Sequence, residues 1–343
     1  MSADLLRPAA TRWYRAERLH GTTWLTWRQN RWLVLVAVVL VAATAVILGR
    51  ESHRINLALA LPRRLGGSCD TMPAATKDLN IPGLNAACQH LFNTELSHTG
   101  YWLSLIQVGL TGLPVLVGMF VGAPLLAREY ERRTYLLAWT QSVSRTRWLA
   151  ARLGMALAVV GLATAAMATL SDRFWDDYVA PVGILNNYRF NVVSYASTGV
   201  MPVVYSLYAL ALGVVVGLLL RRTLPAIGAA GLLTGLTQIV LFQLRPYLYP
   251  AVAVVQPPNV SSGFVAPSGA WTLTSGVVLP GGGRVPEGTG CTLDTCGTVK
   301  GYYGSYQPSS HFWPIQFVES GILLALTLAL LAFAVHRVRR GAA

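Results

Sequence analysis

The stretch AREYERRT (127–134) concentrates the groups of this sequence that could do chemistry. Two carboxylates, Glu129 and Glu131, stand two positions apart among arginines, so a general acid–base pair is the first chemistry to consider. Residues at i and i+2 lie on different sides of a helix, however, and these carboxylates would not converge. No HExxH motif occurs, and the six histidines lie outside the apolar runs or at their ends. We therefore expect no catalytic site and no metal site, and the chain is not expected to be an enzyme.

Long apolar runs dominate the rest of the chain, which has 343 residues, 53% of them hydrophobic and 12% charged. A helix that crosses a bilayer needs about 20 apolar residues. The sequence therefore predicts an all-α integral membrane protein, a single transmembrane domain over residues 1–343. The expected spans are 32–48, 101–127, 148–170, 200–220, 224–244 and 315–335. Only Arg221, Arg222 and Thr223 separate the fourth and fifth runs, so a buried hairpin that does not cross twice is the alternative there.

The segment before the first run mixes tryptophan with arginine in TTWLTWRQNRW (22–32). This pattern predicts an interfacial helix over about 10–31. An aromatic belt that caps the first span is the other interpretation. No cleavable signal peptide is expected, because the chain opens polar and basic.

Arginine placement predicts the orientation. If the N-terminus is cytoplasmic, 17 of the 27 basic residues and only four acids lie on that side, which then carries the whole net charge of +13. This asymmetry follows the positive-inside rule and predicts a multi-pass membrane protein with both termini in the cytoplasm. The positive net charge is then explained by membrane topology and by contact with anionic lipid, so no nucleic-acid partner is expected.

The expected external loops are 49–100, 171–199 and 245–314, and they contain all four cysteines. An even number of cysteines on the oxidising side favours two local disulfides, Cys69–Cys88 and Cys291–Cys296. Free thiols or cross-loop pairs stay open, because four cysteines allow three connectivities. The Cys-x4-Cys spacing has no second pair nearby that would make a metal site. In the third loop, 270–278 has the composition of a short strand, and the loop is expected to form an external cap.

Helical spacing also appears in the opening stretch. Glu129 stands three residues before Arg132 and four before Arg133, which places ion-pair partners together on a helix surface. No Gly or Pro interrupts residues 125–150. These features predict a short cytoplasmic helix between the second and third spans, while a solvated loop that only sets topology is the simpler alternative.

Four segments, in order, resemble a known family. They are TWLTWRQNRW (23–32), GAPLLAREYERRTYLLAWTQSVSRTRWLAARLG (122–154), GVVVGLLLRRTLPAIG (213–228), and the C-terminal stretch from HFWPIQFVESGI to HRVRR (311–340). Together they resemble actinobacterial ATP-binding cassette (ABC) permeases of the exporter class. The resemblance implies that the protein lies in a bacterial cell membrane.

The resemblance implies an interfacial helix, six spans and a coupling helix that docks on a cytoplasmic ATPase. It implies as partners two copies of an ABC ATPase subunit, a second permease in a homodimer, and membrane lipids. ATP and Mg would bind on the ATPase, with no cofactor in this chain. The implied ATPase-coupling residues are Arg128, Glu129, Tyr130, Glu131, Arg132, Arg133 and Thr134, with Arg221 and Arg222 at the second cytoplasmic turn.

The positions of the lysines agree with a separate ATPase subunit. A phosphate-binding P-loop requires GxxxxGK[ST], and that motif is absent. The chain has only Lys77 and Lys300, both in expected external loops. The ATPase is therefore expected to be a separate subunit.

Few polar side chains lie in the expected spans. Glu319 stands near the outer end of the sixth, and its simplest role is an ion pair with an external arginine such as Arg189 or Arg245. Gln107, Gln238 and Gln243 could bond helices together or line a pathway. Three pairs of glycines four residues apart also allow close helix packing: Gly118 and Gly122, Gly213 and Gly217, Gly231 and Gly235.

The sparse polar lining favours an apolar or amphipathic substrate, such as a drug, a peptide or a lipid-like molecule, moved out of the cytoplasm or the inner leaflet. The alternative is a non-transporting ABC-coupled membrane protein for sensing, immunity or resistance signalling.

Overall fold

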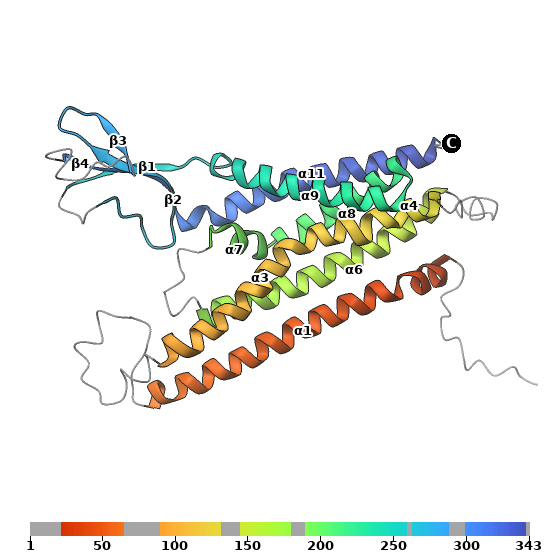
Figure 1. The fold of residues 1–343 in the computed structure, drawn as a ribbon, viewed down its shortest axis with the longest axis horizontal. Helices are drawn as coiled ribbons and strands as arrows, with labels where there is room; N and C mark the ends of the chain where they lie inside the picture. Colours follow the sequence, from red (N-terminus) through yellow and green to blue (C-terminus); the bar gives the residue numbers. More distant parts are fainter. Residues whose placement is uncertain are drawn as a thin grey trace, which may run out of the picture.

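The computed structural model describes residues 22–64, 90–131, 145–179, 189–258, 263–287 and 299–340. Within these ranges, six helical segments are long and apolar enough to cross a membrane, as expected. They are α1 (Thr22–Arg64), α3 (Ser97–Val117) continued by η3 (Gly118–Gly122) and α4 (Ala123–Glu131), α6 (Arg145–Phe174), α8 (Met201–Leu220), α9 (Thr223–Leu244) and α11 (Phe312–Arg339). Successive segments run in opposite directions, so α4, α8 and α11 all finish at one end of the bundle (Figure 1). We call this the arginine-rich end and the opposite one the sheet end.

The central helix of the bundle is α8. It packs against α3, α4, α6, α9 and α11, and most of its residues are buried. Two of its glycines permit this packing. A Cβ at Gly213 would lie 2.8 Å from the backbone nitrogen of Ala123, and one at Gly217 would collide with the carbonyl oxygen of Ala123. The α8 backbone therefore approaches η3 and α4 as closely as only glycine allows.

The first helix is longer than its expected span. With 43 residues, α1 is about 64 Å long at 1.5 Å per residue, about twice the 30 Å hydrocarbon core of a bilayer. Its residues 49–64, expected in the first external loop, continue the helix, and so do residues 22–31 before the span. The described residues thus show no separate interfacial helix, and 10–21 lie outside them.

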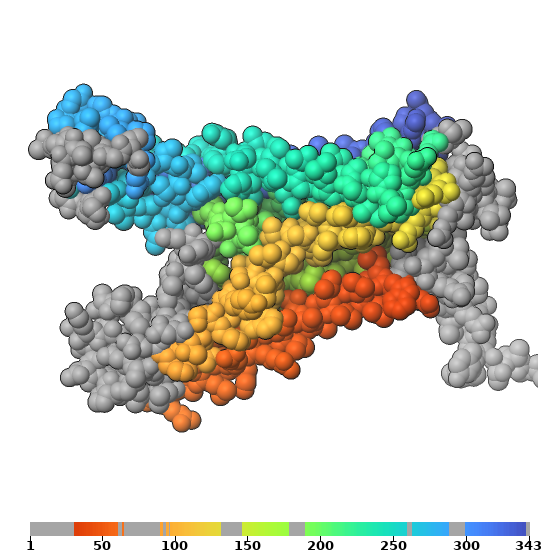
Figure 2. Space-filling model, in the orientation of Figure 1, coloured from red at the N-terminus to blue at the C-terminus, as the bar shows by residue number. Residues whose placement is uncertain are grey.

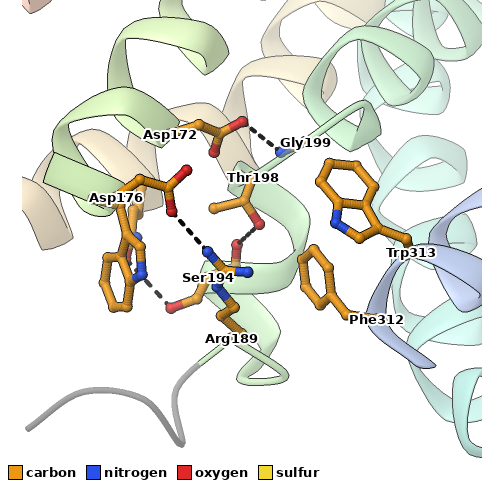
Figure 3. A pocket seen from close by; sticks show the side chains of 10 residues that line it. Asp172, Asp176, Arg189, Ser194, Thr198, Gly199, Phe312 and Trp313 are labelled. Atoms are coloured by element: carbon orange, nitrogen blue, oxygen red, sulfur yellow. Dashed lines mark hydrogen bonds and ion pairs between the residues drawn. The ribbon is translucent and has the colours of Figure 1, made fainter. Parts of the chain in front are cut away.

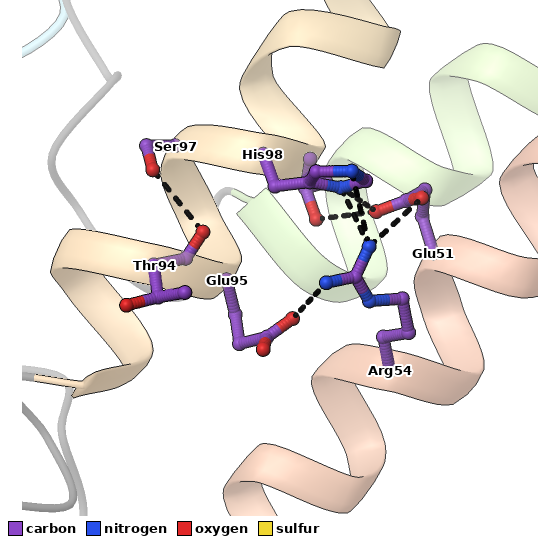
Figure 4. Close-up of polar contacts among 7 residues, drawn as sticks. Glu51, Arg54, Thr94, Glu95, Ser97 and His98 are labelled. Carbon is purple, nitrogen blue, oxygen red and sulfur yellow. Dashed lines mark hydrogen bonds and ion pairs between the residues drawn. The ribbon is translucent and has the colours of Figure 1, made fainter.

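Polar side chains hold the outer part of α1 to the start of the second segment. There the π-helix η2 (Leu91–Leu96) leads into α3 (Figure 4). The buried carboxylate of Glu51 accepts a hydrogen bond from Thr99 Oγ1 at 3.0 Å and lies 3.2 Å from His98 Nδ1. Arg54 lies 3.2 Å from the carboxylate of Glu95. These contacts explain why α1 continues through charged residues after position 49. Glu51 and Arg54 have partners on η2 and α3.

A short helix, α7 (Val192–Ser197), follows the π-helix η4 (Trp175–Val179) at the sheet end. A four-stranded antiparallel sheet projects beyond that end between α9 and α11 (Figure 1). Its strands are β1 (Val252–Gln256), β2 (Trp271–Val278), β3 (Arg284–Pro286) and β4 (Gly301–Gln307), in the order β1-β4-β2-β3. The strand expected at 270–278 is confirmed as β2, but the all-α class is wrong for this segment. The described chain is mostly helical with an added sheet.

The sheet is fixed to the bundle at both its entry and its exit. Gln307 is fully buried; its Nε2 donates to the carbonyl of Tyr249 at 2.7 Å, and its Oε1 lies 2.7 Å from His311 Nδ1. At the start of β2, the ring of Trp271 stacks on Phe190, with centroids 5.7 Å apart. Gln307 thus bonds the end of β4 both to the segment that follows α9 and to the start of the α11 segment.

Candidate functional site

The expected coupling residues that the structure describes form the last turn of α4. Arg128, Glu129, Tyr130 and Glu131 continue the second spanning segment without a break, so they are not part of a separate helix. Arg132, Arg133 and Thr134 lie outside the described residues. Tyr130 is buried against α6 and α8 in the core of the arginine-rich end.

Both glutamates of the opening stretch have partners on other helices of the same chain. Glu129 Oε1 accepts a hydrogen bond from Arg152 on α6 at 2.8 Å, and the two side chains are largely buried, with 19% and 13% exposed. Arg152 also stacks over the ring of Trp148, 5.0 Å from its centroid. This ion pair ties α4 to α6.

Glu131 reaches the start of α9. Its Oε2 accepts hydrogen bonds from the backbone nitrogen and the hydroxyl of Thr223, at 3.0 Å and 2.6 Å. The first amides of a helix have no partner within it, and a carboxylate satisfies them well. The end of α4 is therefore bonded to the beginning of both α6 and α9.

The turn between α8 and α9 belongs to the same end. Arg221 adopts a left-handed conformation (φ 54°) that ends α8, and its nitrogen donates to the carbonyl of Gly217. Its guanidinium carbon lies 5.8 Å from the centre of the Tyr130 ring. Arg222 is exposed. Expected coupling residues from two distant parts of the sequence are thus neighbours.

At the sheet end, Glu319 is fully buried and pairs with Arg245, one of the two arginines considered for it. Arg245 Nε lies 3.2 Å from Glu319 Oε2, and the hydroxyl of Tyr205 donates to Glu319 Oε1 at 2.5 Å. The guanidinium of Arg245 also lies over Tyr195, 3.5 Å from the ring centroid. A fully desolvated ion pair requires such additional contacts. These contacts join α7, α8 and α11 to Arg245, the first residue after α9, from which the chain continues into the sheet.

A small cavity of about 60 Å³ lies at the sheet end between α3, α6, α7 and α11 (Figure 3). Asp176 pairs with Arg189 at 2.8 Å, and Asp172 accepts a hydrogen bond from the backbone nitrogen of Gly199 at 2.9 Å. Gly199 has φ 64°, and a Cβ there would collide with the side chain of Gln316. The volume suffices for a few water molecules.

The three expected polar glutamines differ in position. Gln107 lines the cavity and accepts a long hydrogen bond from Ser194 at 3.4 Å. Gln238 donates to the carbonyl of Thr111 at 3.0 Å, which bonds α9 to α3. Gln243 is exposed on α9. Of the three, Gln107 is the one that lines the cavity described above.

Cys69, Cys88, Cys291 and Cys296 all lie outside the described residues, so their pairing stays a prediction. In the part of the chain that is described, no cluster of His, Cys, Asp or Glu could hold a metal ion.

Sequence reasoning missed several partners in these sites. Arg152 carries no local signal of its role, and Thr223 was expected only as part of the turn between two apolar runs. Tyr205 shares its apolar run with two other hydroxyl-bearing residues, Ser206 and Tyr208, so no local pattern marks it as a partner of Glu319. Asp172 gave no local signal, and Arg189, the other arginine considered for Glu319, pairs instead with Asp176.

Comparison with known proteins places this geometry in a family. The family model described as "ABC-2 membrane transporter related" matches residues 35–245, more than half of the chain. The match includes α4, α6 and α9 and ends before the sheet. No curated protein and no solved structure gave a significant match. The chain thus belongs to the ABC-2 membrane transporter related family, as a multi-pass membrane component whose family membership implies pairing with an ABC ATPase subunit.

Proposed function

We propose that this protein is the permease subunit of an ATP-driven exporter, working as a homodimer with two separate ATPase subunits. ATP and Mg would bind on the ATPases. The arginine-rich end would face the cytoplasm, in agreement with the positive-inside rule. The substrate would be apolar or amphipathic, in keeping with the few polar groups among the spans.

The bonded end of α4 is the observation that carries this proposal. A helix that transmits movement from the ATPase must be bonded to the helices that it moves. The end of α4 is bonded to α6 through Arg152 and to α9 through Thr223. Since Glu129 and Glu131 already have these internal partners, direct contact with the ATPase is assigned to Arg132, Arg133, Thr134 and Arg222.

The test is copurification and transport with the ATPase subunit. The double substitution Arg132→Glu, Arg133→Glu should leave membrane insertion intact, while recovery of the ATPase and ATP-dependent export into vesicles fall about tenfold. The matched control is Arg337→Glu, which reverses a charge on α11 at the same end. Unchanged copurification and transport in the double variant would contradict the coupling role.

The transport measurement also separates export from the sensing and immunity alternative. A reconstituted complex that hydrolyses ATP but moves no hydrophobic or amphipathic compound against a gradient would favour that second role. An exporter concentrates its substrate on one side of the membrane.

A further inference from the structure

Two adjoining hollows lie between α1, the α3–α4 segment and α6. The larger, about 520 Å³, is lined at the arginine-rich end by Trp32, Arg128 and Arg152. The smaller, about 240 Å³, continues toward Met167. Four residues line both, so the hollows form one continuous groove, which we call the α1–α6 groove: Leu33, Val36, Phe120 and Val121. It exists because α1 packs chiefly against α6 and much less against α3. Atoms of α6 are visible between α1 and α3 in Figure 2.

The inner part of the groove offers no polar group to a ligand. Thr164 is the only lining residue there with a hydroxyl, and that hydroxyl donates to the carbonyl of Val160 in its own helix at 2.8 Å. The remaining lining consists of aliphatic, methionine and phenylalanine side chains. Such a surface suits a hydrocarbon chain and gives a polar ligand nothing to bind.

The mouth of the groove is charged instead. Arg128 is exposed there and forms no ion pair with any described residue, while Arg152 is already paired with Glu129. Two arginines and one glutamate leave an excess positive charge. Guanidinium groups bind phosphate through paired hydrogen bonds.

The position of the mouth matches a membrane interface. Trp32 stands there with 65% of its surface exposed, and Trp148 lies beneath Arg152. Tryptophans collect where hydrocarbon meets head groups. The 15 residues from Arg152 to Met167 cover about 22 Å of helix, enough for one leaflet of about 15 Å of hydrocarbon plus part of its head-group layer.

We infer that the α1–α6 groove binds an anionic phospholipid of the adjoining leaflet, with an acyl chain against Leu33, Val36 and Phe120 and the phosphate at Arg128. The groove is distinct from the contacts proposed for the ATPase. The occupant of the groove is identified by the positive charge at the mouth, which complements a phosphate, and by the apolar lining inside, which suits an acyl chain. This inference concerns a bound lipid and does not depend on export.

The experiment measures lipid binding directly, without the ATPase. The purified full chain is reconstituted with phosphatidylglycerol or phosphatidylcholine of identical acyl chains, and bound lipid is counted by native mass spectrometry. Phosphatidylglycerol should bind at least tenfold more tightly. Arg128→Gln should remove most of that preference, since loss of one charged hydrogen bond corresponds to about a tenfold change. Arg339→Gln, an exposed arginine on α11 at the same end, is the matched control and should keep it.

A second pair of variants tests the apolar part. Ala163→Phe places a ring in the inner groove and should lower binding of both lipids, whereas Ala158→Phe, on an exposed face of α6 outside the groove, should not. A photo-crosslinking residue at Phe120, which is 61% exposed and lines both hollows, should label lipid. Equal binding of the two lipids, equal losses in Arg128→Gln and Arg339→Gln, or crosslinks only to protein would overturn the inference.

Discussion

The carboxylate of Glu131 holds both the backbone nitrogen and the hydroxyl of Thr223, 92 residues further along the chain. α9 has no side-chain cap of its own and no acidic residue in its first turn. The cap comes from the last residue of α4, and its negative charge also complements the helix dipole. A displacement of the end of α4 would therefore reach α9 directly.

Removing this cap should destabilise the arginine-rich end. Glu131→Ala leaves the Thr223 nitrogen without its acceptor, and we expect a loss of about 1 kcal/mol in unfolding free energy, seen as a lower thermal midpoint in detergent. Glu131→Gln retains an acceptor without the charge and should lose less. A Glu131→Ala protein with the wild-type midpoint would show that the cap contributes nothing.

The Glu129–Arg152 pair predicts a charge-swap rescue. Glu129→Arg or Arg152→Glu alone places like charges in contact in a largely buried site, and each should cost about 1 to 2 kcal/mol. The double variant restores opposite charges and should recover most of the thermal midpoint and of the ATPase copurification. Recovery of the midpoint without copurification would instead assign Glu129 to the ATPase surface.

The helices were predictable because each is a long apolar run, and a hydrocarbon solvent forces such a run to satisfy its own backbone. Their ends were less predictable. Glu51 is charged and should end an apolar run, yet α1 continues because Thr99 and His98 stand opposite it on α3. The tyrosine-rich strand β4 pairs with β1 about 50 residues earlier, and no local pattern reveals such a partner.

The same limit applied to the candidate site. The local spacing of Glu129 suggested arginines three and four residues ahead, which lie outside the described residues; the structure adds Arg152, 23 residues away on another helix. Local periodicity identifies the face of a helix but not what packs against that face. Glu319 was simpler, because a carboxylate in a spanning helix requires a cation and few arginines stand at its depth.

The glycines of the bundle supply a matched pair of substitutions. Gly213→Ala would place a methyl group against the backbone of η3 and Ala123, and we expect a loss of about 1 to 3 kcal/mol as α8 moves away. Gly235→Ala meets nothing within 4 Å and should be neutral or slightly stabilising, because alanine favours helix. Equal thermal midpoints for the two variants would contradict the close approach of α8.

The cysteines allow a direct chemical test. Two local bonds, Cys69–Cys88 and Cys291–Cys296, should appear in peptide maps of protein purified without reductant, and both should vanish on reduction. Cross-loop peptides linking the first and third loops would contradict the local pairing. Loss of the second bond by a Cys291→Ser, Cys296→Ser substitution should leave the anchor at Gln307 in place, since that anchor depends on Tyr249 and His311.

The buried pair of Glu319 and Arg245 should show strong energetic coupling. Glu319→Gln leaves the guanidinium of Arg245 buried without a counter-charge, and we expect a loss of about 3 kcal/mol or more in unfolding free energy. Replacing both, as Glu319→Leu with Arg245→Met, removes the charges together and should be closer to wild type than Glu319→Leu alone or Arg245→Met alone. The midpoint of tryptophan-monitored thermal unfolding measures each variant. If the double variant instead lost the sum of the two single effects, the residues would be energetically independent despite their contact.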